Sequence, residues 1–469
     1  MKILMVMPSM DNGYWKKLGK KVGPKSEPLS LLYIATFLNN RGHKAEVLDC
    51  EAEGISFEEL ENHIRKNNYD VVGVAMLTPM YSQSLEVCKI AKRVNPNIKV
   101  IVGGSHPTLR PLDTAKEPNI DVAAIGEAEE TFLQVLDAWK NNKPLKNIKG
   151  IAYRENGNPV QTPPAEKIQD LDHFPIPDRS LINMKLYRPS ASYYKQLPAY
   201  TMVTTRGCPY RCTFCATAKT GYRMHSVSRV IEEMKILVEK YHAKEILIRD
   251  DTFTLNRKRT VELCEAIIQS GLNKKVRWDS ITRANLVDYE LLKLMKKAGC
   301  WGMHFGVEGG TQKLIDSIKK DTKIEIIRNA FKLCKKVGIE TRAYMMLGLP
   351  GSTREDDMDT INFAKDINPD WAQFTICTPY PGTQMYDELT KAGELISNNW
   401  DSYQTWSGYS EHELVWTPNG RSSEEIKSLQ RKAMRAFYFR PKVILKKATN
   451  IKDFSILAKY IKGALALNS

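Results

Sequence analysis

The sequence predicts an α/β protein made of two successive parallel-sheet domains, followed by a helical and basic C-terminal region. Three observations predict this class. Residues 1–145 alternate short apolar runs with helical patterns, and residues 196–395 do so again. The apolar runs are nearly continuous, as in parallel strands that are buried on both faces. A chain of 469 residues is also too long for one ordinary hydrophobic core.

The first domain, residues 1–145, is predicted to be a doubly wound sheet. Its expected strands are 3–7, 45–49, 71–77, 100–104 and 122–125, and its expected helices are 29–40, 57–66, 82–94 and 130–139. Ligands of such sheets bind outside the carboxyl ends of the strands. Glycines at those ends let a ligand approach the backbone closely. Residues 146–195 are rich in Pro and Gly and are expected to form a linker, with 148–153 as one strand of a small hairpin.

The second domain, residues 196–395, repeats the strand and helix pattern six times. Its expected strands are 200–203, 245–248, 276–280, 302–307, 341–347 and 372–378. Six such units predict an open parallel barrel, whose chemistry is expected at the C-terminal ends of the strands.

Three cysteines follow the first strand of this barrel. Cys208, Cys212 and Cys215 form a C-x3-C-x2-C array. A structural zinc site would require a fourth Cys or His, for which His225 is the nearest candidate, and the chain has no second C-x-x-C pair. An iron–sulfur cubane held by three thiolates leaves one iron open. The array therefore indicates an iron–sulfur centre with an open coordination position.

The array resembles the signature of the radical S-adenosylmethionine (SAM) enzymes, as do the flanking Arg206-Gly-Cys-Pro209 and Phe214. The resemblance implies that the three cysteines hold a [4Fe–4S] cluster whose open iron chelates SAM, and that one electron cleaves SAM to a 5′-deoxyadenosyl radical. The strand ends are similar to the SAM contacts of that family. The implied contacts are Asp250 or Asp251 to the ammonium, Arg283 to the carboxylate, Glu308 as a further polar contact and Gly348 in the loop beside the adenine.

For these strand-end positions the residues themselves leave other interpretations open. The two aspartates could bind a metal or cap the following turn, and Arg283 could form a salt bridge at the barrel rim. Of the two aspartates, Asp251 is the favoured SAM contact. Family members often have Glu-Ser-Gly where this chain has Glu308-Gly309-Gly310.

The first domain resembles the cobalamin-binding domain that precedes the radical SAM domain in one large subfamily. The resemblance lies in Pro28–Tyr33, Asp70–Val74, Gly103–Gly104 and Gly126–Glu129. It implies cobalamin contacts at Glu51, Thr78, Gly103, Gly104, Ser105, Gly126 and Glu127. Residues 49–54 keep the frame Asp-x-His-x-x-Gly but place Glu51 where the histidine would be. This departure implies cobalamin without a histidine lower ligand, or else a degenerate domain that binds no cofactor.

The two resemblances together imply a cobalamin-dependent radical SAM methyltransferase. It would act on an unactivated carbon (or phosphorus) centre of a small-molecule or lipid-like substrate, with a reductant such as flavodoxin or ferredoxin. Three alternatives stay open: a cyclase or rearrangement enzyme that does not methylate, such as one like the porphyrin-ester cyclases; a sensor without turnover; and a tRNA methylthiotransferase. Methylthiotransferases of tRNA carry a second cluster-binding cysteine set and an RNA-binding domain, and this sequence resembles neither. We therefore expect no nucleic-acid partner.

The C-terminal region, residues 396–469, carries much of the net charge of +15. Residues 421–469 contain twelve Lys or Arg against three Asp or Glu. We expect a helical cap on the open barrel mouth. The alternative is a peripheral contact with a membrane or a lipid-like substrate through the amphipathic stretch 443–467. Nine cysteines without a disulfide-like pattern, and an N-terminus that reads as a buried strand, predict a cytoplasmic protein.

Overall fold

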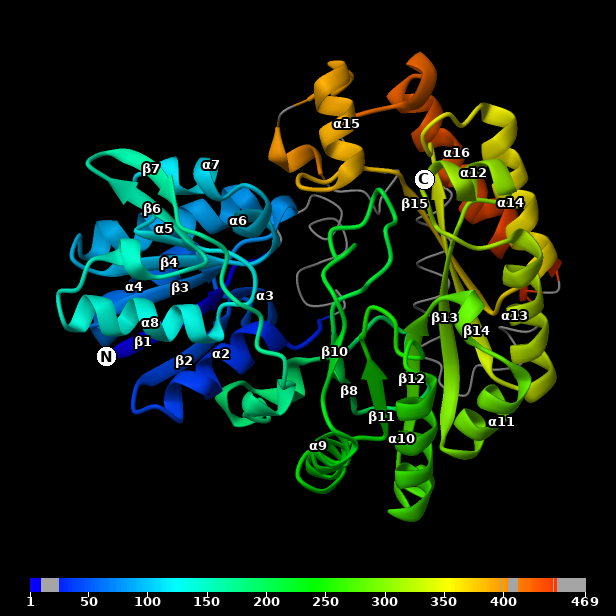
Figure 1. Ribbon diagram of the computed structural model, residues 1–469, viewed down its shortest axis with the longest axis horizontal. Coiled ribbons are helices and arrows are strands. Elements are labelled where there is room, and N and C mark those ends of the chain that lie inside the picture. Colours follow the sequence, from blue (N-terminus) through cyan, green and yellow to red (C-terminus); the bar gives the residue numbers. More distant parts are fainter. Residues whose placement is uncertain (10–24, 398, 404–411, 442, 445–469) are drawn as a thin grey trace. The chain divides into compact units, whose positions relative to one another are not determined.

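The computed structural model describes residues 1–469 except 10–24, 398, 404–411, 442 and 445–469 (Figure 1). The chain divides into two compact units, which are described separately below. Unit 1 comprises residues 1–189 and 398–403, and unit 2 comprises residues 190–397 and 404–469. Within the described ranges, no helix has both the length and the apolar character needed to cross a membrane.

Unit 1 is built on a seven-stranded sheet in the order β2-β1-β3-β4-β5-β6-β7 (Figure 1). The strands are β1 (Lys2–Met7), β2 (Lys44–Asp49), β3 (Val71–Ala75), β4 (Lys99–Gly103), β5 (Val122–Ala124), β6 (Ile151–Glu155) and β7 (Asn158–Gln161). The first five are parallel, and β6 and β7 form an antiparallel hairpin beside β5. The predicted hairpin strand thus extends the main sheet and covers the edge of β5, where backbone groups would otherwise lack partners.

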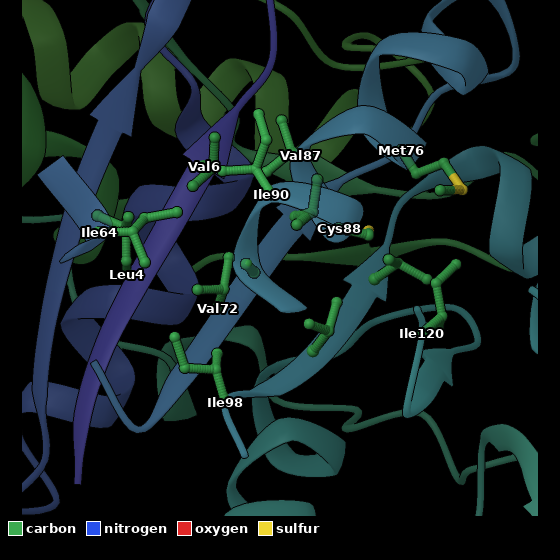
Figure 2. Packing of buried hydrophobic residues seen from close by; sticks show 14 of the residues in the cluster. Leu4, Val6, Ile64, Val72, Met76, Val87, Cys88, Ile90, Ile98 and Ile120 are labelled. Atoms are coloured by element: carbon green, nitrogen blue, oxygen red, sulfur yellow. The ribbon is translucent and has the colours of Figure 1, made fainter. Parts of the chain in front are cut away.

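Helices cover both faces of this sheet, as the doubly wound pattern predicts. They are α2 (Leu29–Asn39), α3 (Cys50–Glu53), α4 (Phe57–Asn67), α5 (Tyr81–Val94), α6 (Ser105–Leu109), α7 (Pro111–Lys116) and α8 (Glu129–Lys140), with short 3-10 turns between them. Strand residues such as Leu4 and Val72 pack with Ile64 of α4 and with Val87 and Ile90 of α5 (Figure 2). Full burial of one such side chain contributes about 1.5–3 kcal/mol.

Unit 2 is built on six parallel strands that follow one another in chain order across the sheet (Figure 1). They are β8 (Ala199–Met202), β11 (Glu245–Ile248), β12 (Arg277–Thr282), β13 (Cys300–Glu308), β14 (Glu340–Leu347) and β15 (Trp371–Ile376), and β9 (Thr205–Arg206) pairs with β10 (Arg223–Met224). The predicted six-stranded open barrel is confirmed. The helices are α9 (Val227–Glu239), α10 (Arg257–Gln269), α11 (Tyr289–Lys297), α12 (Gln312–Ser317), α13 (Ile324–Val337), α14 (Arg354–Ile367), α15 (Gln384–Ala392) and α16 (Ser423–Tyr438).

Helix α16 lies along β15, the last strand of the open barrel. The Tyr438 hydroxyl accepts from the Ala372 amide at 3.1 Å and donates to the Ala372 carbonyl at 2.7 Å. The Gln430 amide donates to the Phe374 carbonyl at 3.0 Å. These side chains satisfy backbone groups of an edge strand, which would otherwise be open to pairing with another chain. The sequence favoured a helical cap over the barrel mouth, whereas α16 covers the edge strand β15. Residues 445–469 lie outside the described part.

Candidate active site

The cysteine loop of unit 2 runs between β9 and β10 and is closed at its base. The Cys208 amide donates to Thr220 Oγ1 at 3.1 Å, and the Thr220 amide returns a bond to the Cys208 carbonyl at 3.1 Å. Gly207 has φ +87°, and a Cβ there would stand 2.7 Å from the Gly221 carbonyl oxygen. Only glycine fits this close approach. Further along the loop, the Thr213 amide donates to the Ile318 carbonyl at 3.0 Å.

Each of the three cysteine sulfurs lies close to one polar side chain, and these three side chains come from three different parts of the chain. Cys208 Sγ lies 3.7 Å from Thr252 Oγ1, Cys212 Sγ lies 3.3 Å from Arg283 Nη1, and Cys215 Sγ lies 3.3 Å from Thr217 Oγ1. Burial raises the pKa of Cys215 above its ordinary value. Metal binding requires the thiolate, so loading of this loop would release protons.

The donor set of the loop fits an iron–sulfur cubane better than a single ion. Across the described residues, no group of three or more His, Cys, Asp or Glu side chains is placed to hold one metal ion. In a cubane each cysteine binds a different iron, so the three sulfurs stand farther apart than they would around one zinc ion. Three soft sulfur donors on one closed loop match a cluster with an open iron.

The two adjacent aspartates that follow β11 lie in different surroundings. Asp250 is buried, and its carboxylate accepts from the Thr204 amide and hydroxyl, both at 2.6 Å, and from the Thr205 amide at 3.1 Å. Burial raises the pKa of Asp250, and the hydrogen bonds from Thr204 oppose this rise. Asp250 therefore ties the end of β11 to the end of β8.

Asp251 is exposed and faces the cysteine loop. Its Oδ1 accepts from Thr217 Oγ1 at 3.3 Å, and the same hydroxyl contacts Cys215 Sγ. Of the two aspartates, Asp251 is the one whose carboxylate is accessible beside the cysteines. The sequence also favoured Asp251, although the two aspartates are adjacent in it.

Glu308 ends β13 in the left-handed region, with φ +67°. Its Oε1 lies 2.9 Å from Lys320 Nζ, and both side chains are buried. A Cβ at Gly306 would stand 2.4 Å from that same oxygen and 3.0 Å from the Lys320 nitrogen, so this glycine leaves room for the ion pair. Sequence reasoning missed Lys320. The only signal was a lysine pair, Lys319-Lys320, just after α12, which reads as ordinary surface charge.

The Arg283 side chain lies against the cysteine loop. Besides its contact with Cys212, its guanidinium donates to the Lys320 carbonyl and stacks over the Tyr210 ring, 3.8 Å from the ring centroid. The predicted contact of Arg283 with a SAM carboxylate stays a prediction.

Gly348 follows β14 and has φ +73°, a conformation that favours glycine. Its amide donates to Asp357 Oδ1 at 3.0 Å, and Asp357 Oδ2 lies 2.8 Å from the Arg421 guanidinium. Burial raises the pKa of Asp357, while the Gly348 amide and Arg421 lower it. The loop predicted to support the adenine is thus tied to α14 through Asp357, which Arg421 in turn contacts.

A buried polar layer inside the barrel was also missed. Asp279 Oδ1 accepts from Arg249 at 2.8 Å, and its Oδ2 lies 3.2 Å from His304 Nε2. His304 Nδ1 lies 3.2 Å from the Tyr344 hydroxyl, which lies 3.4 Å from that of Tyr193. Burial opposes the ionisation of Asp279, but Arg249 and His304 hold its pKa below the usual range. The signal was the inward alternation 302, 304, 306, 308 along β13, where polar and glycine positions recur.

In unit 1 the predicted cobalamin contacts lie at the C-terminal ends of the parallel strands. Thr78 follows β3, Gly103 ends β4 and Gly104 follows it, Gly126 and Glu127 follow β5, and Glu51 follows β2. Gly104 has φ +120°, and a Cβ there would stand 2.8 Å from the Met76 carbonyl oxygen. By contrast, a Cβ at Gly126 would meet nothing within 4 Å. Adjacent strands are about 5 Å apart, so Glu51 lies two strand spacings from Thr78 along this edge.

Three further features complete this edge. Ser105, which begins α6, is exposed. The Gly126 amide donates to Thr108 Oγ1 at 2.9 Å, which joins the ends of β4 and β5. Glu127 lines a cavity of about 410 Å³, together with Glu129, Lys149 and Phe174.

His106 lies just behind this edge and is almost completely buried. Its Nδ1 lies 3.2 Å from Thr78 Oγ1, and its ring packs against Tyr81 and Trp400 with centroids 4.6 Å and 5.0 Å away. Within the described structure its Nε2 has no hydrogen-bond partner. Burial lowers the pKa of His106 to about 4. An orphaned imidazole nitrogen and an open glycine edge fit a large ligand with polar substituents, as cobalamin is.

Comparison with known proteins identifies both units. The model of the B12-binding domain family matches residues 15–136, and that of the radical SAM superfamily matches residues 202–364. An uncharacterized methyltransferase from Pyrococcus horikoshii is 36% identical over 469 residues, which is 99% of this chain and 98% of that protein. The chain belongs to the cobalamin-binding radical SAM methyltransferase family. Its cofactors are accordingly a [4Fe–4S] cluster, SAM and cobalamin.

Two further comparisons show proteins to which this chain is similar. An anaerobic magnesium-protoporphyrin IX monomethyl ester cyclase from Cereibacter sphaeroides is 30% identical over 84% of this chain and 65% of the cyclase. The structure of the radical SAM methyltransferase TsrM from Kitasatospora setae, solved with cobalamin and a [4Fe–4S] cluster, has a TM-score of 0.72 at 19% identity. It covers 94% of this chain and 86% of that one. At that identity the likeness shows the fold.

Proposed function

We propose that this enzyme methylates an unactivated carbon (or phosphorus) centre of a small-molecule or lipid-like substrate, using both SAM and cobalamin. The observation that carries the proposal is the presence, in one chain, of a B12-binding domain and a radical SAM domain, with full-length similarity to a methyltransferase. When bound, the cluster with SAM supplies a carbon-centred oxidant, and cobalamin supplies a transferable methyl group.

The residues of unit 2 would bind and orient SAM. Cys208, Cys212 and Cys215 would hold the cluster. Asp251, exposed beside Cys215, would accept hydrogen bonds from the SAM ammonium, and a carboxylate there also favours a cation through its charge. Glu308 would add a second carboxylate contact, with Lys320 fixing its position. The Gly348 loop would present backbone groups to the adenine.

The residues of unit 1 would hold cobalamin at the strand ends. Gly103, Gly104, Ser105 and Gly126 would let the corrin and its amides come close to the backbone. Thr78 and Glu127 would supply polar contacts, and Glu51 stands where other B12 proteins carry their histidine ligand. The lower face of cobalt would then have no histidine from this position.

An isotope experiment that requires no identified substrate tests the proposal. Full-length protein, reconstituted anaerobically with cluster and cobalamin, is incubated with a metabolite and lipid extract, a reductant and SAM that carries a deuterated methyl group. We expect a product that contains the labelled methyl. The matched control is Cys212→Ala, which removes one cluster ligand and should form no such product. Substrate consumed without any labelled product would contradict methylation.

A second function is favoured by one observation, the 30% identity with the porphyrin ester cyclase over 84% of this chain. An oxidative cyclase would consume SAM to form 5′-deoxyadenosine and release a product with fewer hydrogens and no added methyl. The same labelled experiment separates the two, since only methylation moves deuterium from SAM into the product.

The proposed partners and compartment follow from the chemistry. Reduction of the cluster needs a low-potential electron donor such as flavodoxin or ferredoxin. All nine cysteines are free, as is usual in the reducing cytoplasm, which we propose as the location. The proposed membrane contact falls mainly on residues 445–469, outside the described part.

A further inference from the structure

The guanidinium of Arg283 contacts a cluster ligand. Its Nη1 lies 3.3 Å from Cys212 Sγ, and both residues are buried. A charged N–H at this distance from a cysteine sulfur can donate a hydrogen bond to it. The family resemblance assigns Arg283 to the carboxylate of SAM, which is a different partner.

Three further contacts fix the guanidinium in this orientation. Its plane stacks on the Tyr210 ring at 3.8 Å, Nη2 donates to the Lys320 carbonyl, and Nε donates to Asn285 Oδ1 at 3.4 Å. The fork of an arginine is rigid, so bonds on one side determine where the other N–H groups point. Tyr210 belongs to the cysteine loop itself. The arginine therefore holds the loop and contacts its second cysteine at the same time.

We infer that Arg283 is a positioning residue that sets the reduction potential of the [4Fe–4S] cluster through an N–H···S bond to Cys212. The reduced cluster carries one more negative charge than the oxidised cluster. A cation and a hydrogen bond at a ligand sulfur stabilise the reduced form more, and hydrogen bonding to the sulfurs is a known determinant of cluster potential. Burial strengthens the effect because water screens the charge less. The inference rests on the cluster and is independent of whether the enzyme methylates or cyclises.

A redox titration tests this inference. Full-length wild-type, Arg283→Met, Arg283→Lys and Arg211→Met proteins are reconstituted with iron and sulfide and titrated with dithionite without SAM. One electron from dithionite converts [4Fe–4S]2+ to [4Fe–4S]+, which electron paramagnetic resonance detects. Arg211 is the matched control, since it lies beside Cys212 in the sequence but pairs with the exposed Asp321 at 3.0 Å.

We expect the equilibrium constant for reduction of the cluster to fall about tenfold in Arg283→Met. This corresponds to a reduction potential about 59 mV more negative for a one-electron couple. Arg283→Lys should shift in the same direction by less, because it keeps the charge and loses the fork. Arg211→Met should titrate like the wild type. If the Arg283→Met protein takes up no iron, the reduction potential of the Arg283→Lys protein tests the inference instead.

An unchanged potential in an iron-loaded Arg283 variant would overturn the inference. Equilibrium dialysis with labelled SAM, on the same samples, separates the competing assignment. A variant that loses SAM affinity while its cluster keeps the wild-type potential would place Arg283 on the SAM carboxylate. Failure of the methylation experiment would leave this titration unaffected, because the titration needs no substrate and no cobalamin.

Discussion

The carboxylate of Glu308 lies 2.9 Å from the ammonium of Lys320, at the C-terminal end of the fourth barrel strand. Both side chains are buried, at 10% and 6% exposure, so neither charge can be solvated if its partner is removed. The same lysine accepts, through its carbonyl, the bond that orients Arg283. One residue just after α12 thus supports two of the predicted SAM-site residues.

Replacement of Lys320 by methionine should leave the Glu308 carboxylate buried and unpaired. Breaking a buried pair in this way costs about 3–5 kcal/mol. We expect the free energy of unfolding, measured by urea denaturation, to fall by this order, and SAM affinity to fall with it. Lys319→Met is the control, since that neighbour is exposed. The double variant Glu308→Gln, Lys320→Met should regain much of the lost stability; no recovery would contradict a direct pair.

The two adjacent aspartates should respond in opposite ways to the same substitution. Asp251→Asn should leave the free energy of unfolding nearly unchanged and weaken SAM binding by about tenfold or more, because a bond to a charged group contributes about 1.5–3 kcal/mol. Asp250→Asn should lower stability by about 1–3 kcal/mol, because its amide nitrogen cannot accept the bond that the Thr204 hydroxyl donates to Oδ2. Calorimetry with SAM and urea denaturation measure the two effects. Equal responses of the two variants would count against the assignment of Asp251.

His106 should make stability depend on pH between about 4 and 6.5. Its folded pKa is about 4, below the ordinary 6.5, because burial and then Arg110 disfavour the charged ring, while Asp113 favours it. Between these values the unfolded chain binds a proton and the folded chain does not, so acidification favours unfolding. The resulting loss in the free energy of unfolding is absent above pH 6.5 and reaches about 3 kcal/mol near pH 4.

His106→Asn should reduce this dependence. Urea denaturation of the full chain at pH 7 and pH 5 measures it for both proteins. The loss of stability between the two pH values should be larger in the wild type. An identical loss in both proteins would show that the buried imidazole does not titrate as proposed.

Tyr438→Phe should weaken the closure of the barrel edge. The hydroxyl makes two hydrogen bonds to Ala372, and each contributes about 0.5–1.5 kcal/mol. We expect a loss of about 1–3 kcal/mol in urea denaturation. Lys432→Gln, on the exposed side of the same helix, is the control. If both variants keep wild-type stability, the hydroxyl bonds contribute nothing measurable.

The sequence predicted the strands and the order of the two sheets because their signals are local. A buried parallel strand reads as a continuous apolar run, and three cysteines on one loop lie close together whatever the fold. The residues that sequence reasoning missed act across long separations. Lys320 contacts Glu308 from the segment after α12, and His304 reaches Asp279 from a neighbouring strand. The sequence around Lys320 does not mark it as buried, and the alternation along β13 does not show that Asp279 is the partner of His304.

The C-terminal region shows a second limit of sequence reasoning. Apolar residues at helical spacing over 424–438 indicate a helix with one buried face, and α16 occupies this stretch. The pattern does not say which surface that face covers. Only the contacts of Gln430 and Tyr438 with β15 show that it covers a strand edge.

The most direct test of the central claim measures what becomes of SAM. Reconstituted full-length protein is reduced with SAM, with and without cobalamin, and the nucleoside products are quantified. We predict S-adenosylhomocysteine only when cobalamin is present, together with 5′-deoxyadenosine, since methylation consumes SAM in both ways. 5′-Deoxyadenosine alone, at the same rate with and without cobalamin, would contradict a cobalamin-dependent methyltransferase.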